Sequence, residues 1–514
     1  MEVQSHYDLV VVGGGINGVG IARDAAGRGL SVLLVEQDDL ACATSSASTK
    51  LIHGGLRYLE YFEFRLVSEA LAERETLLRI APHVVWPLEF VLPHEAHLRP
   101  AWMIRLGLLL YDYLGHRAWL GGRTSLPKSH RVSLAGRHGA ALKPEFTTGF
   151  AYHDCWVDDA RLVVLNARSA AALGAHILTR TRMSAATRRR DGWHVTLEDN
   201  SPHGPPRPER EVTAKVLVNA AGPWVRQVAE HRLLTEDGQN LAGGDKVRLV
   251  KGSHIVVPRL HEERHAYILQ NPDRRIVFML PYEREFTLIG TTDVGVDDTV
   301  LGTPAAIGAE ETAYLCEAAS RYCERPITPA DVLWSYSGVR ALHDDGRGDP
   351  SAVTRDYHLA LDDQGPPLLS VYGGKITTYR RLAEHALAKL SRWFPGTHAW
   401  THSRPLPGGE FSAAGFNGLL KRLIERYPTL PPLYLARLAR RHGSLVSDVL
   451  GAAATPDDLG PHHGGGLYQV ELEYLVKHEW VRVADDVLWR RTKCGLHMSP
   501  VERMLLADRL LDLL

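Results

Sequence analysis

Residues 10–20 read VVVGGGINGVG, and this stretch decides the fold. Gly13, Gly15 and Gly18 stand in GxGxxG spacing, between an apolar, strand-like segment and a run of small residues that predicts a helix over 16–29. In that context Gly13 permits a tight turn, Gly15 lets the backbone approach a pyrophosphate, and Gly18 lets helix and strand pack closely. The free N–H groups at the start of the helix would then bind the phosphates.

A second apolar segment at 30–35 follows the helix and ends at Glu36. With the strand expected over 7–12 it forms a strand–helix–strand unit, which is typical of a parallel sheet. A carboxylate at this place accepts hydrogen bonds from ribose hydroxyls and repels a 2′-phosphate. We therefore expect FAD or NAD rather than NADP. No second GxGxxG follows a strand, which indicates a single dinucleotide.

Two further stretches favour FAD over NAD. Residues 43–50 (ATSSASTK) are small and rich in hydroxyl groups that can hydrogen-bond a cofactor, although a solvated loop has a similar composition. Residues 216–224 (VLVNAAGPW) predict a strand that ends in small residues, where the backbone can pass close to a ligand; an ordinary β-turn has the same pattern. The sequence thus favours one FAD.

Charge and composition exclude several classes of protein. Of 514 residues, 59 are Lys or Arg and 60 are Asp or Glu, so the net charge is −1, unlike that of a disordered chain or a protein that binds nucleic acid through bulk charge. No uncharged apolar run reaches about 18 residues, so no spanning helix is expected. The N-terminus lacks the basic start of a signal peptide. Five scattered cysteines without a CxxC pair indicate reduced thiols in the cytosol, with neither a disulfide framework nor a metal site.

Further strands are predicted far apart in the chain. Their separation indicates one sheet assembled from distant pieces, with a second layer inserted between them. The polar, Pro-rich stretch 200–210 is expected to be a surface loop within a hairpin. The predicted strands are 215–219, 253–257 with 276–280, and 368–371.

The C-terminal part predicts a separate helical domain. The composition changes near 395–409 (PGTHAWTHSRPLPGG), and beyond this stretch apolar residues recur at spacings of three and four. The expected helices lie within 419–427, 433–441, 470–483 and 501–514.

Seven motifs, together and in order, resemble the FAD-dependent glycerol-3-phosphate dehydrogenases, in particular the bacterial aerobic branch of that family. The likeness runs from about residue 7 to the C-terminus. The motifs are GGGINGVGIARDAAGRGLSVLLVE (13–36), ATSSASTKLIHGGLRYLE (43–60), GSHIVVP (252–258), IGTTD (289–293), YSGVR (336–340), YGGKITTYR (372–380) and EWVRVADDVLWRRTK (479–493).

The resemblance implies an α/β fold with three parts: a Rossmann-like FAD-binding domain of the glutathione-reductase type, an antiparallel-sheet substrate domain and a C-terminal helical domain. The FAD-binding domain would comprise residues 1–80, 156–225 and 346–395. A substrate- or membrane-facing insert would occupy 81–155, the substrate-binding domain 226–345, and the helical cap 396–514.

A phosphate monoester needs partners that stay charged, and planar guanidinium groups suit it best. Several basic residues follow glycines or short turns, although out of context each one would be an ordinary surface ion pair. The resemblance implies that they line a pocket for phosphate and glycerol. These residues are Arg57, Arg340, Arg355 and Lys375, and the resemblance adds Tyr58 and His254.

Oxidation of a secondary alcohol sends hydride to flavin N5 and the hydroxyl proton to a base, for which histidine has a suitable pKa. His53 lies near the flavin by motif order, and His254 is the rival base; a role in packing is open for both. Arg340 would hold the developing alkoxide.

The expected cofactor contacts come from residues 13–54, from Gly222 and from the segment 373–377. Glycines 373 and 374 would bring the backbone up to the flavin, and a helix that begins near Thr377 or Thr378 would aim its positive end at the flavin pyrimidine. The expected contacts are Gly13, Gly14, Gly15, Asn17, Gly18, Glu36, Thr44, Ser45, Ser46, Ser48, Lys50, Leu51, His53, Gly54, Gly222, Gly374 and Thr377.

The resemblance implies oxidation of sn-glycerol 3-phosphate to dihydroxyacetone phosphate, with ubiquinone or another quinone as acceptor, by a homodimer peripheral to the inner face of the cytoplasmic membrane. Residues 100–117 mix Trp, Leu and Tyr with basic residues, which suits a membrane interface but also an ordinary half-buried helix. Three alternatives stay open: an oxidase that uses oxygen, an amine or amino-acid oxidase of the same fold, and a flavoprotein without enzymatic activity.

Overall fold

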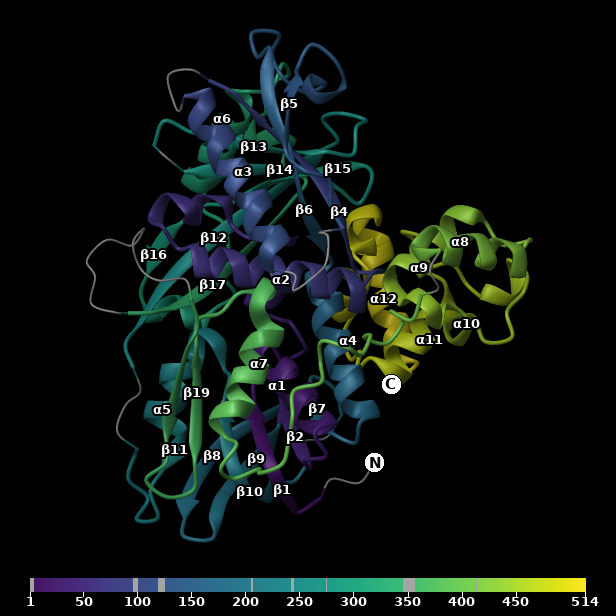
Figure 1. Ribbon diagram of the computed structural model, residues 1–514. Coiled ribbons are helices and arrows are strands. Elements are labelled where there is room, and N and C mark those ends of the chain that lie inside the picture. Colours follow the sequence, from purple (N-terminus) through teal and green to yellow (C-terminus); the bar gives the residue numbers. More distant parts are fainter. Residues whose placement is uncertain are drawn as a thin grey trace.

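The computed structural model describes residues 4–95, 100–118, 125–204, 207–241, 245–273, 275–344, 356–411 and 414–514, without the side chains of Arg57 and of residues 116–118. Figure 1 shows three parts: one sheet with its helices in the lower half, a second sheet in the upper half, and a helical domain beside both.

The glycine-rich stretch begins the first sheet as predicted. β1 (His6–Val12) and β2 (Val32–Val35) pair in parallel, and α1 (Ile16–Gly27) connects them. Alternate residues of both strands pack into two separate apolar clusters, because helices or strands cover both faces of the sheet. One face carries α1, α4 (Asp159–Ala172) and α7 (Tyr379–Lys389), and the other carries α5 (Val225–Arg232).

Pieces from distant parts of the chain complete this sheet. β10 (Arg210–Asn219) and β19 (Leu368–Tyr372) contain the strands predicted at 215–219 and 368–371, and they extend the parallel ladder next to β1. β9 and β10 form an antiparallel hairpin around the loop expected at 200–210. The remaining strands are β7 (His176–Leu178), β8 (Thr181–Arg189), β9 (Gly192–Asp199), β11 (Leu233–Leu234) and β18 (His358–Asp362).

The second sheet is mostly antiparallel. β12 (Val247–Pro258) and β14 (Ile276–Tyr282) contain the strands predicted at 253–257 and 276–280, but β15 (Phe286–Gly290) lies between them. β17 (Trp334–His343) pairs with β12 along its whole length. The other strands are β3 (Leu51–Ile52), β4 (Val85–Pro93), β5 (His130–Ser133), β6 (Thr148–Val157), β13 (Ala266–Gln270) and β16 (Val294–Val296).

Helices cover this second sheet too. α6 (Ala309–Ser320) packs on one face, while α2 (Phe64–Ile80) and α3 (Ala101–Ala118) pack with the cluster on the other. Among the described residues, none of the helices combines the length and the apolar character that crossing a membrane requires.

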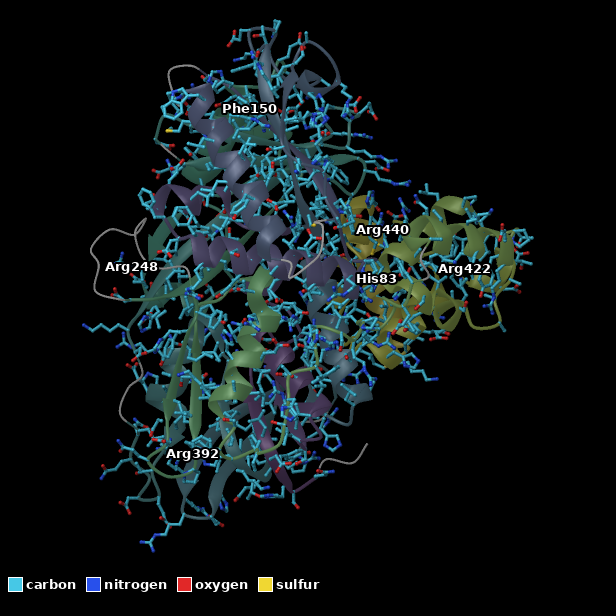
Figure 2. All side chains as sticks on the ribbon, viewed as in Figure 1. His83, Phe150, Arg248, Arg392, Arg422 and Arg440 are labelled. Atoms are coloured by element: carbon cyan, nitrogen blue, oxygen red, sulfur yellow. The ribbon has the colours of Figure 1, made fainter. Side chains whose placement is uncertain are left out.

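The C-terminal helical domain has a hydrophobic core of its own, which confirms the change of structure predicted after 395–409. Arg440 joins it to the sheets, since its guanidinium lies over the rings of Trp86 in β4 and Phe416 in the helical domain. Figure 2 shows Arg440 and His83 together at this junction. The helices are α8 (Gly415–Arg426), α9 (Pro432–His442), α10 (Val446–Leu450), α11 (Gln469–His478) and α12 (Pro500–Leu511).

Candidate dinucleotide and substrate site

The glycine loop between β1 and α1 has the close contacts that its spacing predicts. Gly13 has φ +113°, and a Cβ atom there would lie 2.5 Å from the carbonyl oxygen of Ala220. A Cβ on Gly18 would lie 1.9 Å from the carbonyl oxygen of Gly13. Only glycine fits both positions. The turn therefore presents its backbone, rather than side chains, to a ligand at the start of α1.

Glu36 lies at the end of β2 against this loop. One of its carboxylate oxygens accepts the N–H of Gly14 at 2.7 Å, and the other accepts the N–H of Asp38 at 2.8 Å. Burial raises the pKa of Glu36 to about 7, although these two N–H groups act to lower it. The carboxylate is thus fixed at the place where a ribose hydroxyl would arrive.

The hydroxyl-rich stretch 43–50 has two roles. Ser45 Oγ accepts the N–H of Ile16 at 3.0 Å, so this side chain closes the start of α1. Ser48 Oγ donates to Asp159 at 2.8 Å. Lys50, expected to contact the cofactor, is buried and its Nζ lies 2.9 Å from both oxygens of Asp159. The ion pair with Asp159 neutralises the buried ammonium group of Lys50. Lys50 therefore stabilises the 43–50 stretch from the side that faces away from the cavity.

Two glycines that follow β19 lie close to the start of α1. Gly373 and Gly374 have φ +71° and +98°, and the Gly373 carbonyl accepts a hydrogen bond from Asn17 Nδ2 at 3.1 Å. The other amide atom, Asn17 Oδ1, is buried without a hydrogen-bond partner in the described part of the chain. A buried acceptor without a donor, beside backbone that bears no Cβ atoms, fits a cofactor that supplies a donor.

A cavity of about 630 Å³ joins these features. It runs between the two sheets, from Glu36 to the segment after β19. The expected residues that line it are Gly13, Gly15, Asn17, Glu36, Thr44, Ser45, Ser48, Leu51, His53, Tyr58, Gly222, Arg340, Gly374, Lys375 and Thr377.

Other expected residues lie behind this lining in the described structure: Gly14, Gly18, Ser46, Lys50, Gly54 and His254. Ser46 Oγ donates to the carbonyl of Ala43 instead. The N–H of Gly54 donates to Tyr111 Oη. Two expected substrate contacts, the Arg57 side chain and Arg355, lie outside the described residues.

The environment of His254 differs from the one expected for a second candidate base. It is 1% exposed, its ring stacks on Tyr336 with centroids 4.8 Å apart, and its Nε2 lies 3.0 Å from Thr49 Oγ1. Burial, together with the charges of Lys50 and Arg340, lowers the pKa of His254 well below its usual range. The imidazole is packed in the core and is hydrogen-bonded to Thr49, which belongs to the cavity lining.

His53, by contrast, is half-buried in the cavity wall. Its backbone N–H donates to Thr377 Oγ1 at 3.3 Å, and its ring meets Phe278 edge-on at 6.2 Å. η7 (Ile376–Thr378) leads directly into α7, so a helix starts at the predicted place. The hydroxyl of Thr377 therefore connects this helix start to the segment that carries His53.

Two cations also line the cavity. Arg340, on β17, contacts Asp293 at 2.5 Å and Thr291 Oγ1 at 3.3 Å. Lys375 Nζ lies 4.0 Å from the centre of the Tyr58 ring. A guanidinium carries five N–H donors, so Arg340 can hold an anion in addition to Asp293.

Some lining residues were not singled out by the sequence. Thr49 belongs to the hydroxyl-rich stretch and Thr291 to the IGTTD motif, so both lay within recognised signals. Trp224 ends the 216–224 stretch and so also lies within a recognised signal, whereas Phe278 gave none, because an aromatic residue in a predicted strand is usually part of the core.

Comparisons with known proteins agree with this geometry. A family model described as FAD dependent oxidoreductase matches residues 8–380, and one described as C-terminal domain of alpha-glycerophosphate oxidase matches residues 399–507. The chain is 52% identical over 499 residues to the aerobic glycerol-3-phosphate dehydrogenase of Escherichia coli (strain K12), covering 96% of this chain and 95% of the relative. It is 49% identical over 499 residues to the D-erythritol 1-phosphate dehydrogenase of Brucella abortus (strain 2308), covering 96% of each.

Among solved structures, the glycerol-3-phosphate dehydrogenase from Bacillus halodurans complexed with FAD is similar over nearly the whole chain. Its TM-score is 0.72 at 26% sequence identity, and the match covers 99% of this chain and 95% of that one.

Proposed function

The chain belongs to the FAD-dependent oxidoreductases, within the glycerol-3-phosphate dehydrogenase family, and from this we propose that it oxidises sn-glycerol 3-phosphate to dihydroxyacetone phosphate. The observation that carries the proposal is the continuous cavity whose lining includes the dinucleotide loop, His53, Arg340 and Lys375. One end suits a dinucleotide, and the other offers a base and two cations, as a phosphorylated alcohol requires.

FAD suits the residues present: the glycine turn, the fixed carboxylate of Glu36 and the buried acceptor of Asn17 all face the cavity. When bound, FAD supplies the acceptor for the hydride that leaves the substrate carbon. The residues that would hold it also include Thr44, Ser45 and the backbone of Gly374.

In this proposal, the positive charges of Arg340 and Lys375 bind the negative groups of the substrate, which are its phosphate and its developing alkoxide. A ring nitrogen of His53 accepts the proton of the substrate hydroxyl. Tyr58 packs beneath Lys375 and orients its ammonium group, since a cation over an aromatic face is attracted to it. The cavity lies between two sheets, where the effective dielectric constant is lower than in bulk water, and this strengthens each of these charge interactions.

The acceptor and the membrane form the second part of the proposal. We propose a quinone as acceptor and a peripheral location on the cytoplasmic face of the membrane, with α3 as the contact. Its outer side exposes Trp102, Leu106 and Tyr113 at 69%, 59% and 56%. Its inner side carries buried Tyr111, whose hydroxyl accepts the N–H of Gly54 at 2.8 Å. The exposed apolar side of α3 and the segment that bears His53 thus lie on opposite sides of this helix.

The homodimer that the family resemblance implies also stays a proposal. Sedimentation velocity of the detergent-solubilised protein checks it, and a single species with the mass of one chain would contradict it.

The decisive experiment is anaerobic stopped-flow absorbance of the flavin band. We expect sn-glycerol 3-phosphate to bleach the flavin faster than D-erythritol 1-phosphate, the substrate in the name of the relative that is 49% identical. Faster bleaching by the four-carbon phosphate would contradict the proposed substrate, and no bleaching by either would contradict the class of substrate. After reduction, we expect a soluble ubiquinone to restore the absorbance; rapid recovery with oxygen alone would indicate an oxidase.

A further inference from the structure

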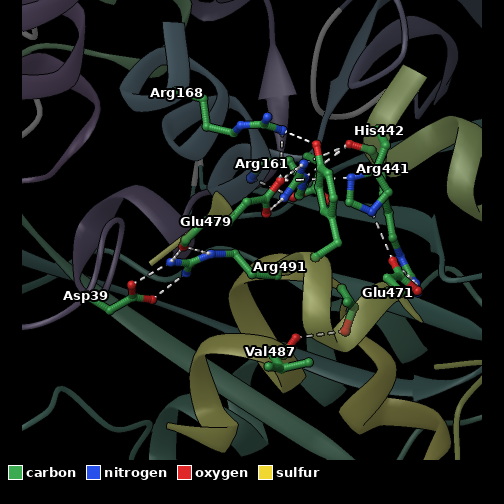
Figure 3. A network of polar contacts seen from close by, with 12 residues as sticks. Asp39, Arg161, Arg168, Arg441, His442, Glu471, Glu479, Val487 and Arg491 are labelled. Carbon is green, nitrogen blue, oxygen red and sulfur yellow. Dashed lines mark hydrogen bonds and ion pairs between the residues drawn. The ribbon is translucent and has the colours of Figure 1, made fainter. Parts of the chain in front are cut away.

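One segment of the helical domain, residues 479–493, fixes that domain to the nucleotide-binding sheet with buried charges. Figure 3 shows part of this network, with Asp39 and Arg491 at one end and Arg161 and Glu479 at its centre. Several of its ion pairs join the segment to loops of the first sheet or to α4. The pairs are Glu479 with Arg161, Asp486 with Arg180, Arg490 and Arg491 with Asp39, and Lys493 with Asp158.

Asp39 differs from the other partners because of where it lies. It belongs to the turn at 36–42 that follows β2, and Glu36, Asp38, Ala41 and Cys42 of this turn line the cofactor cavity. The Asp39 side chain, 1% exposed, faces the helical domain. The turn therefore has one side against the cofactor and one against the C-terminal segment.

The contact between Asp39 and Arg491 is a bidentate ion pair. Arg491 Nη1 lies 2.5 Å from Oδ2 and Nη2 lies 2.7 Å from Oδ1, and Arg490 Nε also lies 2.5 Å from Oδ2. Burial alone would raise the pKa of Asp39, but the two guanidinium groups lower it to about 2. A planar guanidinium on a carboxylate fixes direction as well as distance.

Arg491 is itself held rigidly. It is fully buried, and its Nε and Nη2 donate to the Glu479 carbonyl at 3.2 and 2.6 Å. It ends a π-helical segment, η10 (Asp486–Arg491), which is closed by the N–H of Thr492 on the carbonyl of Val487 at 3.1 Å. Such π-helical turns occur often at functional sites.

The other side of the turn is held by the glycine loop. The N–H of Ala41 donates to the Gly14 carbonyl at 3.1 Å, and the N–H of Gly14 donates to Glu36 at 2.7 Å. A shift of Asp39 would therefore move Glu36 and the glycine loop together, because these hydrogen bonds couple them.

We propose that Asp39 and Arg491 are positioning residues for FAD, and that the helical domain, through this pair, holds the 36–42 turn in the conformation that binds the ribose. The domain would thus determine how tightly the enzyme retains its cofactor. The inference uses FAD as cofactor and holds whichever alcohol phosphate is oxidised.

The test compares variants of the purified holoenzyme. Removing one partner leaves a buried unpaired charge, which can unfold the protein, so the main variant is the double substitution Asp39→Asn with Arg491→Gln. We measure the rate of FAD release from flavin fluorescence, the Kd for FAD after reconstitution, and the unfolding midpoint. We expect the Kd for FAD to rise about ten- to a hundredfold. A change of this size corresponds to the loss of one hydrogen bond to a charged group.

The matched control is Glu479→Gln. Glu479 is as deeply buried and lies in the same segment, but its side chain pairs with Arg161 on α4 and not with the turn. This variant should lower the unfolding midpoint and leave the Kd for FAD within about twofold. The conservative Arg491→Lys, which keeps the charge without the bidentate contact, should give an intermediate Kd.

Two results would overturn the proposal: a folded double variant with unchanged FAD release, or a Glu479→Gln variant that loses FAD as readily as the double variant. The second result would mean that any loosening of the domain contact releases the cofactor, and that the Asp39–Arg491 pair has no particular role.

Discussion

At the scale of single residues, burial separates two histidines that the sequence offers as rival bases, of which motif order places His53 near the flavin. His53 lies half-buried in the cavity wall, whereas His254 is 1% exposed beneath Tyr336. A base must reach the proton that it removes, so accessibility decides between them. His53 is therefore the residue on which we base the catalytic prediction.

We expect His53→Gln to lower the rate of flavin reduction by about 10²- to 10⁴-fold, because the substrate hydroxyl loses its proton acceptor. The measurement is anaerobic stopped-flow absorbance with saturating substrate. His254→Gln is the comparison: it should lower the unfolding midpoint and change the rate far less. Equal rate losses in both variants would contradict the assignment of the base to His53.

At the scale of elements, the β1–α1 turn depends on the absence of a side chain at Gly18. The Cβ atom of Gly18→Ala would lie 1.9 Å from the Gly13 carbonyl oxygen, so the backbone must shift. We expect a loss of unfolding free energy of about 1–3 kcal/mol or more, with reduced FAD content. Gly295→Ala is the control, since open space surrounds that position. Chemical unfolding and the ratio of flavin to protein absorbance measure both effects.

Helix α3 allows a test of the proposed membrane contact. Replacing Trp102 and Leu106 by Glu on its exposed face should reduce binding to vesicles of anionic phospholipid at least about tenfold, because two apolar side chains no longer enter the interface. The control Leu433→Glu changes a residue that is 45% exposed on α9 of the helical domain. Cosedimentation measures the bound fraction, and an equal loss in the control would argue against a contact through α3.

At the scale of the whole molecule, the three parts meet through buried polar groups, and some of these make the structure sensitive to acid. Burial, with the charge of Arg161, lowers the pKa of His83 to about 3 at the junction with the helical domain. Burial likewise lowers the pKa of His265, which directly precedes β13 of the second sheet, to about 3. Because the unfolded chain binds these protons more readily, stability falls as the pH decreases from about 6.5 toward these values.

The expected loss is at most about 1.4 kcal/mol per pH unit for each such histidine. In the His83→Gln variant, the unfolding free energy should therefore decrease less steeply as the pH is lowered from about 6.5 to about 4. The slope should be smaller by the contribution of one histidine. Denaturant unfolding at a series of pH values measures the slope. A variant whose slope equals that of the natural protein would show that His83 does not contribute.

The sequence by itself determined the parts of this protein that depend on local chemistry. The glycine spacing at 13–18, the carboxylate at the end of β2 and the helical periodicity after 395–409 were predicted, because turns, strand ends and helix faces follow from residues near each other in the chain.

The tertiary structure decided what depends on distant contacts. Lys50 was predicted to bind cofactor, but Asp159, far along the chain, neutralises it in the core. Likewise, the pairing of Asp39 with Arg491 joins residues at opposite ends of the sequence. A charged residue has no preferred partner until the fold brings one to it, so only the assembled domains distinguish a side chain that faces the cavity from one that holds the cavity wall in place.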